Sequence, residues 1–193
     1  MESLFNLKDK NAIITGSSRG IGKAIAYRMA EHGAKVIITS RKLDACEAVA
    51  KEINDTFGEG HATSIACNIS DKEQLQNLYK KSLDFCGSIS TLVCNAAINP
   101  YFGPSNKIPD EAFEKIMKSN VQSNFWLCNE ILPDMVKIKS GSIIIISSIA
   151  GLHGSSMLGA YAISKAADSL SLIHISEPTR PLYISYAVFC LKK

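Results

Sequence analysis

Apolar and polar positions divide the chain into two alternating kinds of segment. Short apolar runs, which are typical of buried strands, lie at 11–15, 35–40, 63–68, 91–95 and 142–147. Between them, apolar residues at helical spacing predict helices at 21–32, 43–57, 71–85, 110–136 and 158–169. This alternation predicts an α/β fold in a single domain, a doubly wound parallel sheet with helices on both faces and right-handed crossovers.

The first turn from strand to helix is rich in glycine. Residues 11–22 read NAIITGSSRGIG, so the strand is followed by a loop with Gly16, Gly20 and Gly22, and Gly33 is placed to end the helix in a left-handed conformation. A glycine-rich turn lets backbone N–H groups approach a pyrophosphate at the positive helix terminus. The spacing differs from G-x-G-x-x-G, and an ordinary turn is the alternative. Strand, loop, helix and second strand in this order favour a dinucleotide-binding site.

Each predicted strand ends at, or is followed by, a residue of interest: a glycine for the first strand and a polar residue for each of the others. Because ligands of open parallel sheets bind at the carboxyl ends of the strands, we expect one site to gather the residues at these ends. They are Gly16, Ser40, Asn68, Asn95 and Ser148.

The end of the second strand indicates which dinucleotide binds. A carboxylate there would accept hydrogen bonds from the adenosine ribose and repel a 2′-phosphate. This chain has Ser40, Arg41 and Lys42 instead, with Arg19 in the glycine loop. Guanidinium groups bind phosphate in a fork, so the sequence favours NADP over NAD. The alternative is a solvated basic turn.

Tyr161 and Lys165 lie four residues apart in YAISK, with Ser147 and Ser148 thirteen to fourteen residues upstream of the tyrosine. Residues at i and i+4 share one face of a helix. An ammonium there favours the phenolate, so the phenol could exchange a proton with a carbonyl or alcohol. Taken alone, the spacing also fits an ordinary surface helix.

Five motifs in order carry a family resemblance: TGSSRGIG, CNAA at 94–97, Asn120 in SNVQSNF, IISSIAG and YAISK. They resemble the classical short-chain dehydrogenase/reductase family over roughly residues 6–169, and CNAAINPYFG is similar to its carbonyl- and ketoacyl-reductase branches. The resemblance implies a Rossmann-like fold and an NADP-dependent oxidoreductase acting on a ketone or secondary alcohol. A 3-oxoacyl-thioester reductase of fatty-acid synthesis and an inactive dinucleotide-binding fragment remain alternatives. The motifs leave the substrate and the reaction direction open.

The resemblance also implies a set of cofactor-binding residues: Gly16, Ser18, Arg19, Gly20, Ile21, Gly22, Ser40, Arg41, Asn68, Asn95, Ala96, Tyr161 and Lys165. Three residues depart from the family pattern. Asn68 stands where an acidic residue usually reaches the adenine, although an amide oxygen can accept the same bond. Cys94 and Ala97 replace an asparagine and a glycine, and a positive φ at Ala97 would add strain.

The same resemblance assigns catalytic roles. Tyr161 would donate a proton to the carbonyl oxygen in reduction and remove one in oxidation, while Lys165 would hold the nicotinamide ribose. Ser148 would hydrogen-bond the carbonyl oxygen, a role for which Ser147 is less suited. Asn120 would fix a water that links Lys165 to solvent. The alternatives are a hydroxyl that caps a turn for Ser148 and a buried amide that pins a helix for Asn120.

Composition narrows the class of protein. The 193 residues are 46% hydrophobic and 20% charged, as in a soluble globular enzyme. A net charge of +3 is too small to indicate nucleic-acid binding, and six cysteines without C-x-x-C pairing argue against a metal or disulfide framework. Cys67 and Cys94 are expected in the core. The N-terminus lacks the apolar stretch of a secretory signal, and the run at 142–150 is too short to span a membrane. We therefore expect a cytoplasmic enzyme with a small-molecule substrate.

The last residues have a different character. Leu170–Arg180, LSLIHISEPTR, looks like the conceptual translation of a transposase adapter used in sequencing libraries. We therefore expect a truncated dinucleotide-binding domain at 1–169 and a non-native tail at 170–193, the alternative being a divergent C-terminus. Pro178 and Pro181 would break a helix, and His174 receives no role.

This interpretation of the tail predicts that the sheet lacks its last strands and ends in an unpaired edge. Full-length relatives have two more strands and a segment that closes over the substrate. They often form tetramers through the helices that bear Asn120 and Tyr161. A homotetramer is thus implied for a full-length protein but not for a chain in which the second of these helices is cut short.

Overall fold

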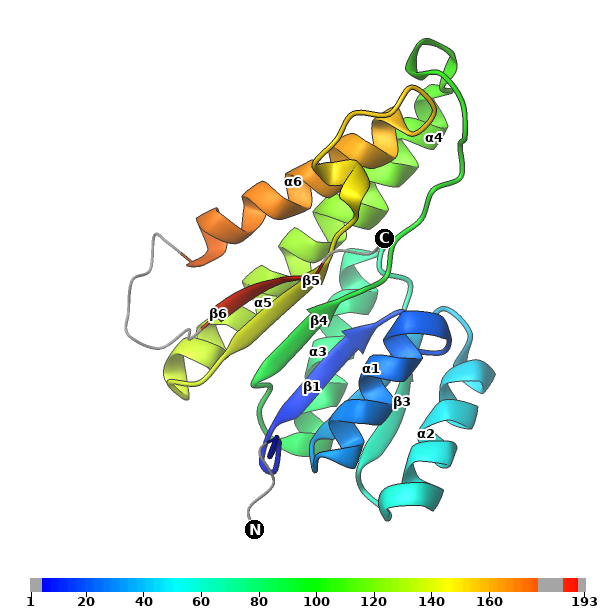
Figure 1. Ribbon diagram of the computed structural model, residues 1–193. Helices are drawn as coiled ribbons and strands as arrows, with labels where there is room; N and C mark the ends of the chain where they lie inside the picture. Colours follow the sequence, from blue (N-terminus) through cyan, green and yellow to red (C-terminus); the bar gives the residue numbers. More distant parts are fainter. Residues whose placement is uncertain (1–4, 177–185, 191–193) are drawn as a thin grey trace.

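A parallel sheet of six strands organises the chain (Figure 1). The computed structural model describes residues 5–176 and 186–190, with the backbone alone for 172–176 and 186–190. Along the sheet the strand order is β3-β2-β1-β4-β5-β6, and every neighbouring pair is parallel. The strands are β1 Asn11–Thr15, β2 Lys35–Ser40, β3 Ala62–Ala66, β4 Thr91–Cys94, β5 Ser142–Ile146 and β6 Tyr186–Cys190. The order reverses between β1 and β4, which confirms the doubly wound topology and places a crevice at that point.

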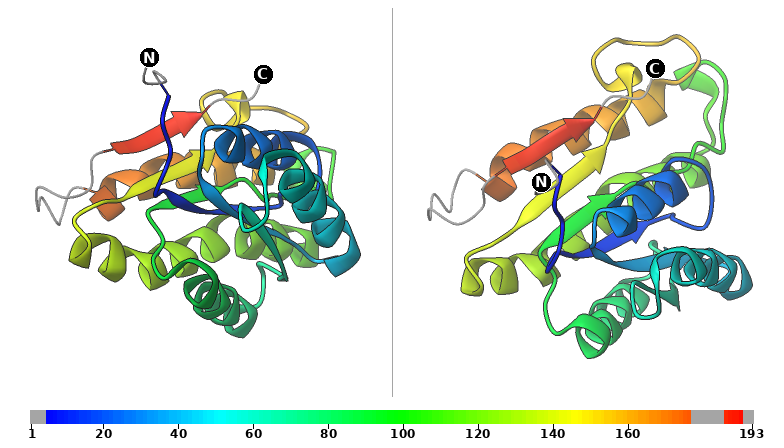
Figure 2. Two further views of the ribbon diagram at one scale, coloured as in Figure 1. Left: turned by 90° about the horizontal axis from the view of Figure 1, so that it is seen from below. Right: turned by 60° about the horizontal axis from the view of Figure 1, so that its bottom comes forward.

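Helices cover both faces of this sheet (Figure 2). The helices are α1 Gly20–Glu31, α2 Leu43–Phe57, α3 Lys72–Cys86, α4 Asp110–Met117, α5 Ser123–Lys137 and α6 Gly159–Ser176. Three shorter elements are η1 Ser105–Lys107, the π turn η2 Lys118–Gln122 and η3 Ile149–Gly151. α1 and α2 pack on one face, α3 and α5 on the other, and α6 lies alongside α5.

β1 and β2 are apolar in nearly continuous runs, as expected for strands that are buried on both faces. Ile13 and Ile37 point into the core beneath α3 and α5, whereas Ile14 and Ile38 point into the core beneath α1 and α2. All four isoleucines are fully buried. Two cores on one sheet fix the register of β1 and β2, and so fix where their carboxyl ends open.

Helix ends follow the local chemistry of the chain. Asp71 caps α3 by accepting hydrogen bonds from the backbone N–H groups of Glu73 and Gln74, at 3.0 and 3.1 Å. Gly33, just after α1, has a φ of 96°, which confirms its expected left-handed conformation.

The helix predicted at 110–136 contains a π turn instead of running without interruption. α4 and α5 are joined through η2, whose Asn120 is fully buried. Its side chain is hydrogen-bonded to Ile98 and Ser164, from other parts of the chain. A tertiary contact of this kind leaves no trace in hydrophobic spacing, and π turns occur frequently at functional sites.

Two expectations about the C-terminal part are wrong. The last helix, predicted to end at residue 169, continues through Ser176. No glycine or proline occurs between Ser169 and Pro178, and helices end at or before the residue preceding a proline. β5 is also not an unpaired edge, since β6 pairs with it from Ser142↔Tyr186 to Ile146↔Cys190. The exposed N–H and C=O groups of an edge strand accept another extended segment of the chain. The origin of residues 170–193 stays a hypothesis.

Candidate active site

The loops after β1 and β4 are hydrogen-bonded into one unit. Thr15 Oγ1 accepts from the backbone N–H groups of Asn95 and Ala96, each at 3.0 Å. In return, Asn95 Nδ2 donates to the carbonyl oxygens of Thr15 and Gly16, at 2.8 and 3.2 Å. The predicted glycine loop is therefore held from below by Asn95, which explains the need for an asparagine at this position.

A serine that was not among the predicted site residues ties the same loop to β2. Ser17 Oγ donates to the carbonyl of Ile14 at 2.6 Å and accepts from the N–H of Thr39 at 2.9 Å. Its own N–H donates to the Thr39 carbonyl at 3.1 Å. Ser17 is fully buried, so its function is to shape the loop.

The three glycines of the loop serve different purposes. Gly16 and Gly20 have φ values of 66° and 59°, in the left-handed region that favours glycine. At Gly22 the reason is space, since a Cβ there would lie 2.5 Å from Asn95 Nδ2 and from the Gly16 carbonyl oxygen. Gly22 thus lets α1 pack closely against the loop.

A cavity of about 690 Å³ opens above these loops, at the carboxyl ends of β1, β2 and β4. Its size is in the usual range for a ligand site. The predicted site residues that line it are Gly16, Ser18, Arg19, Ile21, Ser40, Arg41, Asn95 and Ala96. Sequence reasoning did not assign Ala45, Ile69 or Ile98, which line it too; apolar lining residues carry no chemical motif.

The positive charges around the cavity suit the negatively charged phosphate groups of a dinucleotide. α1 begins at its edge, with no acidic residue in the first turn and no side chain that caps the N-terminus, so its positive end is available to an anion. Arg19, Arg41 and Lys42 are exposed along the rim. None of the three forms an ion pair with any residue that the structure describes.

The three residues that depart from the family pattern, Asn68, Cys94 and Ala97, lie in different places. Asn68 is exposed, and its Oδ1 accepts from the N–H of Ser70 at 3.2 Å, while its neighbour Ile69 lines the cavity. Ala97 lines the cavity as well, but it does not have the positive φ that would have strained an alanine. Cys67 and Cys94 are buried in the core, as predicted.

The tyrosine and lysine of YAISK lie one turn apart on α6, whose first half packs against η3. Tyr161 is half-buried, whereas Lys165 is only 2% exposed. The Lys165 ammonium donates to the carbonyl of Ile146, at the end of β5, and to Asp168 Oδ2, each at 3.0 Å. Lys165 is therefore fixed at the carboxyl edge of the sheet, next to the segment that carries Ser148.

The two serines after β5 have different surroundings. Ser147 is buried and its hydroxyl donates to the Lys165 carbonyl at 3.2 Å, which is a structural contact. Ser148 is half-buried and its oxygen accepts from the N–H of Ala150 at 3.2 Å. This bond leaves the Ser148 hydroxyl proton for another acceptor.

Asn120 is pinned by three side-chain hydrogen bonds. Its Oδ1 accepts from the N–H of Ile98 at 2.8 Å, and its Nδ2 donates to the Ile98 carbonyl and to Ser164 Oγ, each at 3.0 Å. Both amide hydrogens are therefore donated within the protein, so only oxygen lone pairs remain for the predicted water. The side chain holds the loop after β4 against α6.

The ion pair beneath the site was missed by sequence reasoning. Asp168 is 1% exposed and, besides Lys165, it accepts from Asn124 Nδ2 at 3.0 Å. The lysine–aspartate spacing of three residues on one helix face was a signal. Burial of both groups could not be deduced from that spacing.

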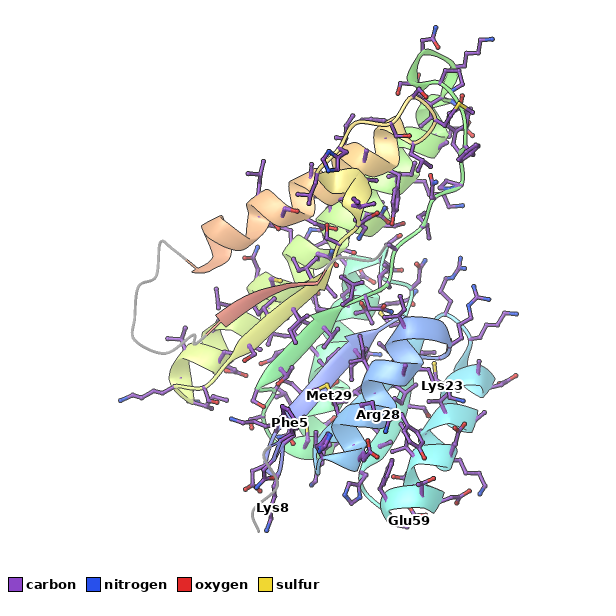
Figure 3. All side chains as sticks on the ribbon, in the orientation of Figure 1. Phe5, Lys8, Lys23, Arg28, Met29 and Glu59 are labelled. Atoms are coloured by element: carbon purple, nitrogen blue, oxygen red, sulfur yellow. The ribbon has the colours of Figure 1, made fainter. Side chains whose placement is uncertain are left out.

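A second cavity lies at the other end of the sheet. A cavity of about 740 Å³ lies at the opposite, amino end of the strands, where Phe5, Lys8 and Glu59 contribute to its lining (Figure 3); it is far from the strand ends that carry the motifs. Over the described part of the chain, no three His, Cys, Asp or Glu side chains are grouped as metal ligands would be. None of the helices described is long and apolar enough to cross a bilayer.

Comparison with known families and proteins gives consistent matches. The family model described as short chain dehydrogenase matches residues 10–175. Dehydrogenase/reductase SDR family member 4 of Bos taurus is 36% identical over 162 residues, and that of Oryctolagus cuniculus is 38% identical over 162 residues. Each alignment covers 83% of this chain but only 57% and 61% of the relatives. The chain thus spans less than two thirds of the length of these curated relatives.

Solved structures share the fold. A metagenomic short-chain oxidoreductase in complex with NADP superposes with a TM-score of 0.89 at 30% identity, covering 96% of this chain and 82% of the other. An NAD⁺-bound xylitol dehydrogenase superposes with a TM-score of 0.87 at 25% identity, covering 94% and 68%. Both forms of the dinucleotide therefore occur among proteins of this shape.

Proposed function

Because the chain belongs to the short-chain dehydrogenase family, we propose that it transfers a hydride between NADP(H) and a ketone or secondary alcohol, with Tyr161 as the acid and base. The observation that carries the proposal is the cavity of about 690 Å³ at the sheet's switch point. A glycine loop, the N-terminus of a helix and a basic rim surround it.

The dinucleotide would be held by these same features. Its pyrophosphate would bind at the N-terminus of α1, where backbone N–H groups of the loop are available. Asn95 would act indirectly, by keeping the loop in shape through its bonds to Thr15 and Gly16. The nicotinamide ring would supply or accept the hydride.

Tyr161 would give a proton to the substrate oxygen in reduction and take it back in oxidation. The ammonium of Lys165 has three N–H groups, of which two are donated to Ile146 and Asp168. The third would hydrogen-bond the nicotinamide ribose. Ser148 would donate its hydroxyl proton to the same substrate oxygen and stabilise the charge that develops there.

The preference for NADP rests on the rim. Arg19 and Arg41 are exposed, have no acidic partner in the described residues and line the cavity at the end of β2. A guanidinium can bind a 2′-phosphate in a fork, whereas no carboxylate at the end of β2 is present to accept bonds from a free ribose hydroxyl.

Binding and turnover of the purified chain test the proposal. We expect NADPH to bind more tightly than NADH in a fluorescence titration, and NADPH to be oxidised in the presence of a ketone from an alkyl and aryl panel. Faster turnover of acetoacetyl thioesters than of simple ketones would favour the narrower 3-oxoacyl-thioester reductase. Binding of NADPH without turnover of any carbonyl compound would favour the inactive fragment, and no binding of either dinucleotide would refute the proposal.

A further inference from the structure

A buried ion pair lies directly beneath the candidate active site. Lys165 and Asp168 are 2% and 1% exposed, and their charged atoms are 3.0 Å apart. An ion pair on the surface of a helix is common, but two charges removed from water lose hydration that their mutual attraction repays only in excellent geometry. The pair therefore calls for a reason other than stability.

Both oxygens of the Asp168 carboxylate accept hydrogen bonds. Asp168 Oδ2 accepts from the Lys165 ammonium, and Oδ1 accepts from Asn124 Nδ2, also at 3.0 Å. The second hydrogen of the same amide is donated to the Asn120 carbonyl at 2.7 Å. Asn124 thus connects the carboxylate to the π turn that holds Asn120, so the ion pair is tied to both α5 and α6.

Burial has the largest effect on the pKa of Asp168. It raises the pKa of Asp168 above its ordinary value, although Lys165 and Asn124 oppose the shift. Among the described residues, the titratable groups near the Asp168 carboxylate are Lys165 on the same helix, Cys94 at the end of β4, and Cys128, which contacts Cys94 from α5. The contact with Cys128 and burial raise the pKa of the Cys94 thiol, so this thiol stays neutral and Asp168 is the counter-charge to the lysine.

We propose that Asp168, held by Asn124, is a positioning residue for Lys165: it fixes the ammonium at the carboxyl end of β5 with one N–H left for the cofactor ribose. This inference rests on the proposed function. The carboxylate also offsets part of the positive charge that the ammonium presents to the site.

Two consequences distinguish this role from a merely structural one. If the carboxylate aims the ammonium, its removal weakens cofactor binding only while Lys165 is present. If it offsets the ammonium charge, its removal shifts the pH profile of the reaction to lower pH. A residue that only stabilises the fold would produce neither effect.

The test compares Asp168→Asn, which keeps the shape and removes the charge, with wild type, Lys165→Met and the double variant. NADPH affinity is measured by fluorescence titration in the absence of substrate. We expect Asp168→Asn to weaken binding about threefold to tenfold, the effect of one misplaced charge-assisted hydrogen bond. In the Lys165→Met background the same change should have no further effect.

The second readout is the pH dependence of alcohol oxidation with NADP⁺. The pH at which the rate reaches half its maximum should fall by on the order of one unit in Asp168→Asn, as expected for loss of a nearby buried charge. Ser169→Ala is the matched control, because Ser169 donates to the Lys165 carbonyl in the same turn but does not contact the ammonium. It should change neither NADPH binding nor the pH profile. Circular dichroism of each variant verifies that the fold is retained.

The outcomes separate the two proposals. Additive effects of Asp168→Asn and Lys165→Met on NADPH affinity, or an Asp168→Asn protein that behaves like Ser169→Ala, would overturn the positioning role while leaving the proposed function intact. If the wild-type chain binds neither dinucleotide, the proposed function fails and the positioning role with it.

Discussion

Replacement of Gly22 by alanine tests whether the glycine loop has the packing that the structure gives it. A methyl group at this position would lie 2.5 Å from Asn95 Nδ2, 2.5 Å from the Gly16 carbonyl oxygen and 2.9 Å from Ser17 Cα. Distances this short cannot be relieved by rotating a flexible side-chain end, because two of the three neighbours are backbone atoms. Either Asn95 or the loop must move.

The size of the effect follows from what is lost. If Asn95 moves away, its bonds to the Thr15 and Gly16 carbonyls break at about 1 kcal/mol each. Overpacking destabilises the protein by about 1–3 kcal/mol more. The higher helix propensity of alanine offsets about 1 kcal/mol of this loss. We expect a net loss of about 2–4 kcal/mol in the free energy of unfolding, or a melting temperature lower by roughly 5–15 °C for a chain of this size.

Gly20→Ala is the matched comparison on the same loop. Gly20 has a φ of 59°, but a Cβ there would meet nothing within 4 Å, so the cost is limited to backbone strain of about 1 kcal/mol. Urea unfolding followed by circular dichroism measures both variants. The reasoning is refuted if Gly22→Ala unfolds within about 0.5 kcal/mol of wild type, or if Gly20→Ala is the more destabilising of the two.

Three further predictions address the rim, a helix cap and a core thiol. Arg41→Glu should weaken NADPH binding about tenfold or more while changing NADH binding less than about threefold in a fluorescence titration; equal weakening of both would argue against a phosphate contact. Asp71→Ala should lower the melting temperature near neutral pH, because hydrogen bonds, first from the Gln74 N–H, hold the Asp71 pKa below its ordinary value. That stabilisation is present above the unfolded pKa of about 3.9 and lost as the pH falls through the folded pKa, so a difference that persists in strong acid would contradict it. Burial raises the pKa of Cys67 to about 12, so N-ethylmaleimide at about pH 8 should label this thiol only after unfolding; rapid labelling of the native protein, seen by peptide mass spectrometry, would be inconsistent with a buried thiol.

Much of the fold was predictable because local pattern and tertiary burial agree. The apolar runs of β1 and β2 are buried on both faces, and the helix predicted at 43–57 is α2 with the same bounds. Convergence at the strand ends followed from topology alone, and Gly16, Ser40 and Asn95 do line one cavity. Asn68 and Ser148 do not line it. Asn68 follows β3, the neighbour of β2, and Ser148 follows β5, the neighbour of β4.

What the sequence could not predict depends on contacts between distant segments. Asn120 lies in a π turn, and its side-chain amide is hydrogen-bonded to Ile98 and Ser164. Asp168 has the sequence context of an ordinary helical aspartate, yet it is buried and hydrogen-bonded to Asn124 and Lys165. The pairing of β6 with β5 was missed because expectations there rested on the origin of residues 170–193 rather than on the open edge of β5.

The most direct test of the proposed chemistry is the rate of NADPH oxidation by a Tyr161→Phe variant, measured with the ketone that the wild-type chain reduces fastest. Loss of the proton donor should lower kcat by about 10²- to 10⁴-fold, while the dissociation constant of NADPH should stay within about twofold of wild type because the substitution removes one hydroxyl group and leaves the glycine loop and the basic rim of the cavity unchanged. Undiminished turnover by the phenylalanine variant would contradict the assignment of Tyr161 as the acid and base.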